Sequence, residues 1–177
     1  MSDFISDLGI RAEQYWQKWE NFRKQHDLKE FKPSTVAFKS QDIANFNQIL
    51  GLLLDQDLVN QCHIGFVDKR YIASIVLHKP LFKDIYIIKL MQRRPNSTDP
   101  VGLDHMDFYV DRLNDIEDYF KSKDLAKWDY ETNESHKWIS LRFDNTEAKF
   151  VDHLVLDVCV MELRNVSSKI GFKPISL

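Results

Sequence analysis

The chain has 177 residues, of which 44% are hydrophobic and 12% aromatic, so it can bury a sizeable core as one domain. Its 24 basic and 27 acidic side chains are interspersed and give a formal net charge of −3, which does not indicate a nucleic-acid interface. No apolar run is long enough to span a membrane, and the first residues lack the basic start of a signal peptide. We therefore expect a cytoplasmic protein with neither nucleic acid nor a membrane as partner.

Residues 1–31 predict an amphipathic helix with one strongly aromatic face. Charged side chains occupy its other faces. A stripe of this kind is typical of a helix that docks on its own domain, although a partner surface is an alternative. The stripe residues recur at spacings of three and four: Phe4, Ile5, Leu8, Ala12, Tyr15, Trp16, Trp19 and Phe22.

Two later stretches repeat the order strand, helix, strand, strand, strand. They span residues 32–92 and 103–153, and a linker rich in proline and small polar residues joins them at 93–102. Ser40 or Asp42 can cap the helix of the first stretch, and Asp111 can cap that of the second. The last three strands are expected at Val59–Val67, Tyr71–His78 and Asp84–Met91 in the first stretch, and at Lys127–Glu131, Lys137–Phe143 and Glu147–Val151 in the second.

The remaining residues, 154–177, form a closing segment and tail. Residues 154–163 are apolar nearly all round, which favours a closing helix but fits a buried strand almost as well. Cys159 in this segment and Cys62 are the two cysteines, far apart and without the spacing of a metal site. We expect two reduced thiols, with a single disulfide left open. The fold class predicted from the whole pattern is α+β: one domain of two βαβββ modules with an added amino-terminal helix.

The second module opens with a strand of the form x-His-x-x-Phe, around His105. A pair of βαβββ modules with this strand resembles the vicinal oxygen chelate superfamily, which includes glyoxalases, extradiol dioxygenases and bleomycin-resistance proteins. More narrowly, Gly102–Val110 and Trp138–Phe150 are similar to the YecM family of bacterial proteins. The resemblance covers about Lys32 to Arg164. It implies a glyoxalase-like open barrel in which four side chains hold divalent iron, manganese, zinc or nickel.

Only one of the four ligand positions implied by this resemblance keeps a metal-binding side chain. His105 matches the histidine of the second module, whereas Thr35 stands at the equivalent position of the first. The two last-strand positions fall at Lys89 and at Val151, although a register shift of one residue would bring Asp152 to the latter. We therefore predict no bound cofactor, with His105 and Asp152 as the metal ligands to consider if a divalent metal does bind.

Strand alternation predicts which side chains share the interior with His105. A lysine beside Asp107 would neutralise that carboxylate without a metal, and would favour a small, anionic ligand. The expected cavity residues are Thr35, Lys39, Lys89, His105, Asp107, Tyr109 and Lys149.

Three functions are compatible with these residues. The leading hypothesis is a small-molecule-binding protein of the vicinal oxygen chelate type with a degenerate metal site. The first alternative is a metal-dependent lyase, isomerase or dioxygenase that uses His105 with Asp107 and Asp152. The second is a structural or protein-interaction module that docks a partner through its aromatic helix. The sequence leaves open the ligand and the oligomeric state.

Overall fold

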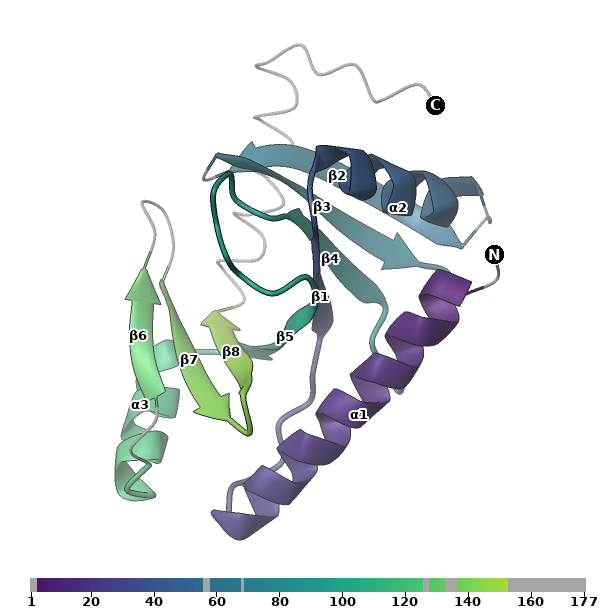
Figure 1. Ribbon diagram of the computed structural model, residues 1–177. Helices are drawn as coiled ribbons and strands as arrows, with labels where there is room; N and C mark the ends of the chain where they lie inside the picture. Colours follow the sequence, from purple (N-terminus) through teal and green to yellow (C-terminus); the bar gives the residue numbers. More distant parts are fainter. Residues whose placement is uncertain (1–2, 56–57, 68, 126–127, 133–136, 153–177) are drawn as a thin grey trace.

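The computed structural model describes residues 3–55, 58–67, 69–125, 128–132 and 137–152 (Figure 1). Within these ranges it contains three helices and one sheet of eight strands. The helices are α1 (Asp3–Gln25), α2 (Ile43–Asp55) and α3 (Leu113–Ser122). The strands are β1 (Thr35–Ser40), β2 (Val59–Val67), β3 (Arg70–Leu77), β4 (Ile87–Gln92), β5 (Gly102–Val110), β6 (Trp128–Thr132), β7 (Lys137–Phe143) and β8 (Thr146–Asp152).

The predicted repeat is confirmed by the order of the elements and by their pairing. Each repeat contains a strand, a helix and three further strands, and the sheet order is β2-β3-β4-β1-β5-β8-β7-β6. In both repeats the first strand pairs in parallel with the last, β1 with β4 and β5 with β8. The two repeats meet where β1 and β5 pair antiparallel. The edge strands β2 and β6 do not pair with each other in the described residues, so the sheet is open and the predicted α+β fold class is confirmed.

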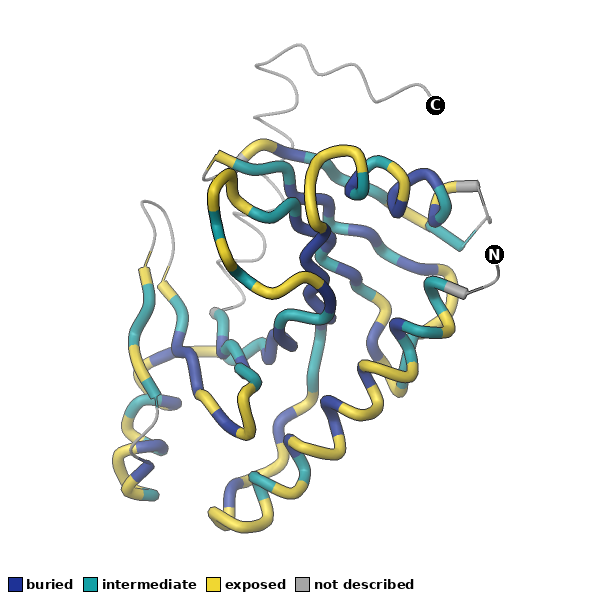
Figure 2. Tube along the Cα trace, in the orientation of Figure 1, coloured by how far each residue is buried: buried dark blue, intermediate teal, exposed yellow. Residues whose placement is uncertain are grey.

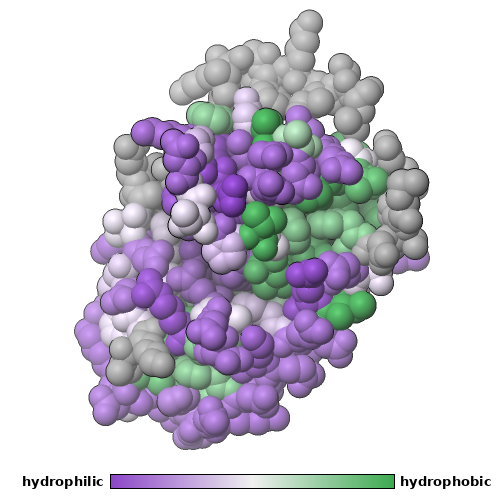
Figure 3. Space-filling model, in the orientation of Figure 1, coloured by the Kyte–Doolittle hydropathy of each residue, from purple (hydrophilic) through white to green (hydrophobic). Residues whose placement is uncertain are grey.

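The aromatic stripe of α1 packs on one face of this sheet. Trp16 and Trp19 are 4% and 0% exposed, and the Trp19 ring lies 5.0 Å from that of Phe108 in β5. Phe143 of β7 and Phe150 of β8 also contact the Trp19 ring. Figure 2 shows buried residues along the inner side of the helix, and in Figure 3 the broadest apolar area of this view lies between α1 and α2. The stripe therefore belongs to the core, which removes the basis for a partner surface made by these aromatic residues.

Two local predictions need correction. Asp111 does not cap α3, because the residue before the helix is Arg112 in extended backbone, with no side-chain cap. The strand expected from Asp84 begins at Ile87, because Asp84 lies in a turn closed by a bridge between Phe82 and Ile85. By contrast Asp42 does cap α2, since its carboxylate accepts a hydrogen bond from the backbone N–H of Asn45 at 2.8 Å.

Other sequence predictions fall partly or wholly outside the described residues. Cys62 is a free thiol, but Cys159 and the closing segment 154–163 are not described. None of the helices in the described ranges is long and apolar enough to cross a membrane. The domain limits and the cytoplasmic location stay predictions.

Candidate functional site

Polar side chains gather on the face of the sheet opposite the helices, which we call the helix-free face. Its centre is the antiparallel pair β1–β5, in which Thr35 lies opposite Asp107 and Ala37 opposite His105. On the outer sides of this pair, Lys89 of β4 lies next to Ala37, and Lys149 of β8 lies next to Asp107. Since alternate residues of a strand share a face, the apolar side chains between them, such as Phe108, point toward the helices. The register thus brings together side chains from both repeats.

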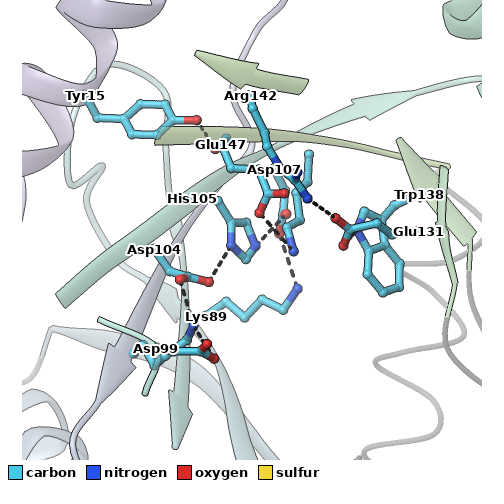
Figure 4. A network of polar contacts seen from close by, with 12 residues as sticks. Tyr15, Lys89, Asp99, Asp104, His105, Asp107, Glu131, Trp138, Arg142 and Glu147 are labelled. Carbon is cyan, nitrogen blue, oxygen red and sulfur yellow. Dashed lines mark hydrogen bonds and ion pairs between the residues drawn. The ribbon is translucent and has the colours of Figure 1, made fainter. Parts of the chain in front are cut away.

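His105 lies between two carboxylates, one at each ring nitrogen (Figure 4). Its Nδ1 is 2.8 Å from Oδ2 of Asp104, and its Nε2 is 3.1 Å from Oδ1 of Asp107. The second contact lacks hydrogen-bond geometry, so both Nε2 and Oδ1 are buried atoms without a hydrogen-bond partner among the described residues. His105 and Asp107 are only 2% and 3% exposed. Such unsatisfied buried atoms are rare in folded proteins and mark a site that could accept a ligand.

Asp104 is the residue that sequence reasoning missed. Regular alternation would place it on the opposite face from its neighbour His105. The β1–β5 register shifts between Ala37 and Phe38, however, and this bulge leaves Asp104 without an opposing residue on β1. The one sequence signal for this bulge is Gly102 at the start of β5, because glycine within a strand often marks a bulge. In the structure Gly102 has a φ of +119°.

The three lysines of the helix-free face have different partners. Lys39 is enclosed, with Nζ 2.9 Å from Oδ1 of Asp104 and 3.2 Å from Oδ2 of Asp99 in the linker. Lys89 is more open, and its Nζ lies 3.5 Å from Oδ2 of Asp107. The third lysine is Lys149 in β8. Lys149 Nζ lies 3.4 Å from Oε2 of Glu147 and 5.2 Å from the centre of the Trp138 ring.

Both carboxylates beside His105 are held in the ionised form. Burial raises the pKa of Asp107, but the charge of Lys89 and the contacts with His105 and Lys149 lower it by more, so the net pKa is well below the ordinary value. Burial also raises the pKa of Asp104, and its contacts with His105 and Lys39 again more than reverse the effect. At neutral pH these two groups are therefore acceptors and negative charges, and they do not supply protons.

The remaining predicted cavity residues lie next to this group. Thr35 Oγ1 and Tyr109 OH are 2.8 Å apart and share a hydrogen bond across the β1–β5 pair. Strand β8 pairs with β5 in regular register, Tyr109 with Val151 and Val110 with Asp152. The assignment of Asp152 as a metal ligand stays a prediction.

The four-ligand metal centre implied by the resemblance does not fit these residues. Thr35, Lys89 and Val151 occupy three of its positions, and an ammonium group cannot ligate a metal ion. Asp104 and Asp107 contact different nitrogens of the same imidazole ring, so one ion could not bind all three side chains. In the part of the chain that the structure describes, no group of three or more histidine, cysteine, aspartate or glutamate side chains is placed to hold a metal.

Trp138 and Glu131, both outside the predicted set, also contribute to the helix-free face. Trp138 of β7 donates from Nε1 to Oε2 of Glu131 at 3.1 Å (Figure 4). The Trp138 ring also contacts Lys149. Alternation along β7 could have found Trp138, because it pairs with Val151. From the other side of the sheet, Tyr15 of α1 donates to the backbone carbonyl of Glu147 and so ties the helix to β8.

Comparison with known proteins identifies the fold. No protein-family model matches the sequence, and no curated protein matches it either. Among solved structures, a structural-genomics protein named EC4020 is similar over 90% of this chain and 93% of its own, with a TM-score of 0.71 and 12% identity. Methylmalonyl-CoA epimerase from Mycobacterium tuberculosis is similar over 68% of this chain and 86% of its own, with a TM-score of 0.53 and 11% identity.

A third similar structure is the hypothetical protein BH1468 from Bacillus halodurans C-125. It covers 70% of this chain and 95% of its own length, with a TM-score of 0.52 and 12% identity. At such low identities the likeness concerns the fold and does not transfer an activity. The chain therefore has a glyoxalase-like fold, similar to that of methylmalonyl-CoA epimerase.

Proposed function

We propose that this chain is a small-molecule-binding protein of the vicinal oxygen chelate type, related to the YecM family, with a degenerate metal site. The observation that carries the proposal is the contact of Lys89 with Asp107, 3.5 Å between Nζ and Oδ2. It puts an ammonium group at a position where the resemblance leads one to expect a metal-binding carboxylate. In this proposal the helix-free face is still a polar site for a ligand, but its side chains differ from the metal ligands that the resemblance implies.

The ligand that fits this face best is a small anion with two neighbouring oxygens. Lys89 and Lys149 flank Asp107 from opposite sides, and the side chain of Lys89 is 32% exposed. Lys39, by contrast, is 8% exposed and already contacts two carboxylates. Lys89 and Lys149 each contact a single carboxylate, Asp107 and Glu147 respectively. They are therefore the groups available to an incoming carboxylate or enolate, because charge-assisted hydrogen bonds bind such oxygens well. One structural neighbour is named after methylmalonyl-CoA, which is itself an anionic molecule.

Calorimetric titration with oxalate and with methylmalonate tests this proposal. We expect wild-type protein to bind at least one of them, and Lys89→Met and Lys149→Met each to weaken that binding about 10-fold, equivalent to about 1.4 kcal/mol. Lys24→Met is the matched control, since its side chain is 70% exposed on α1, away from the helix-free face. Binding of neither anion, or binding that both lysine substitutions leave unchanged, would overturn the proposal.

A further inference from the structure

We propose that the ammonium group of Lys89 takes the place of a metal cation at this site. We further propose that His105 and Asp107 are two ligands of a divalent-metal site, which we call the half-site. The inference concerns the site of the proposed function and rests on the placement of Lys89 there. It predicts a property that the proposed function does not: removal of one ammonium group should create affinity for a metal ion.

The first support is the geometry of the two unpartnered atoms. Nε2 of His105 and Oδ1 of Asp107 are both buried, lack a hydrogen-bond partner among the described residues, and lie 3.1 Å apart. Two ligands at about 2.05 Å from one ion are about 2.9 Å apart in octahedral and about 3.3 Å apart in tetrahedral coordination. The observed separation falls between these values. An imidazole nitrogen and a carboxylate oxygen are also a common ligand pair for zinc.

The second support lies on the other nitrogen of the same ring. Asp104 Oδ2 is 2.8 Å from Nδ1 of His105, and Oδ1 of the same carboxylate is 2.9 Å from Nζ of Lys39. One ring nitrogen, Nδ1, thus faces the Asp104 carboxylate, while the other, Nε2, faces Asp107. Metal-binding histidines are oriented in this way, with one nitrogen on a carboxylate and the other on the ion. The orienting carboxylate is thus present beside the half-site.

The third support is the approach of Lys89. Ala37 of β1 lies between Lys89 and His105 in register, and its methyl group leaves the long side chain free to reach across β1 toward Asp107. Nζ of Lys89 then lies 3.5 Å from Oδ2, the oxygen of Asp107 that does not face His105. The ammonium neutralises the carboxylate and repels a divalent ion from the half-site. A carboxylate at position 89 would reverse both effects.

Zinc titration of chelator-treated protein tests the inference, with calorimetry and thermal melting as readouts. We expect Lys89→Glu to bind one equivalent of zinc at least about 100-fold more tightly than wild type, with a rise in melting temperature on zinc addition. The gain should disappear in the double variant Lys89→Glu/His105→Ala. Lys24→Glu changes the net charge equally on exposed α1 and should behave like wild type.

A second variant guards against misfolding of Lys89→Glu, which brings two carboxylates together. Lys89→Met keeps the length of the side chain and adds no charge, and zinc should raise its melting temperature while leaving that of wild type unchanged. The inference would be overturned if wild type bound zinc as tightly as Lys89→Glu. It would equally be overturned if zinc affected neither variant. These zinc measurements do not depend on oxalate or methylmalonate binding, so the inference and the proposed function can fail separately.

Discussion

Asp104 and His105 are neighbours in the sequence, yet Oδ2 of the first lies 2.8 Å from Nδ1 of the second on one face of β5. In a regular strand their side chains would point to opposite faces. The bulge at this point of the β1–β5 pair makes the contact possible. Lys39, Asp104, His105, Asp107 and Lys89 consequently form a continuous chain of polar contacts, each 2.8 to 3.5 Å long.

Removal of the Asp104 carboxylate should destabilise the protein. In Asp104→Ala the buried Nδ1 of His105 loses its acceptor and Lys39 loses its closer partner, so we expect a cost of about 1–3 kcal/mol in the free energy of unfolding. Urea denaturation measures this cost. Asp115→Ala is the control, because Asp115 pairs with Arg112 on the exposed surface of α3; its effect should stay below about 0.5 kcal/mol. Equal effects of the two substitutions would contradict this interpretation.

Trp19 should be among the most costly positions to truncate. It is fully buried and contacts rings from α1, β5, β7 and β8, so Trp19→Ala should lower the free energy of unfolding by about 3–5 kcal/mol. Gln17→Ala on the exposed side of the same helix should have little effect. A melting temperature unchanged in Trp19→Ala would show that the helix does not dock on the sheet as described.

Asp107 should make stability depend on acid pH. Its pKa is lower in the folded than in the unfolded protein, where it is about 3.9. The contribution of Asp107 to folding stability is therefore fully present above its pKa in the unfolded protein. It is lost as the pH falls below about 4 toward its lower pKa in the folded protein. Denaturation between pH 6 and pH 3 should show a smaller loss of stability in Asp107→Asn than in wild type. Asp104 contributes in the same direction, so part of the loss should remain. Identical pH profiles would refute this role of Asp107.

Cys62 should react slowly with thiol reagents. Burial raises the pKa of its thiol to about 11. Since the thiolate is the reactive form, its fraction at pH 8 is about 100-fold lower than for a cysteine with a pKa near 9. A Cys159→Ser variant isolates the reaction of Cys62 with Ellman's reagent. Urea should accelerate this reaction to the rate of a free thiol, and a fast reaction of the folded protein would contradict the raised pKa of the partly buried Cys62.

The repeat and the packing of α1 could be predicted from the sequence because both depend on periodic patterns. Alternation along β1 and β5 placed Thr35, His105 and Asp107 on one face, and the structure brings them together. Alternation along β4 likewise brought Lys89 within 3.5 Å of Asp107. These patterns depend only on the local geometry of a strand, which the order of apolar and polar residues reports directly.

The role of Asp104 could not be predicted in the same way. A bulge depends on how two strands pair, and no single strand reports the register of its partner. Asp99 is a second example, since it reaches Lys39 from the linker and its position depends on the path of the chain from β4 to β5. The missing cap at Asp111 is a third, because the turn before α3 places Arg112 at that position. In each case tertiary structure decides what the local sequence leaves open.

The antiparallel pairing of β1 with β5 also has a consequence for how the molecule folds. Thr35 and Tyr109, which share a hydrogen bond across this pair, are 74 residues apart in the chain. The hairpins β2–β3, β6–β7 and β7–β8 join strands that follow one another in the sequence, and so they close much shorter loops. Contacts of long sequence separation carry a larger entropic cost and slow folding. Each repeat can thus form its local hairpins alone, whereas Lys39 and Lys89 of the first repeat reach Asp104 and Asp107 of the second only when the two repeats dock.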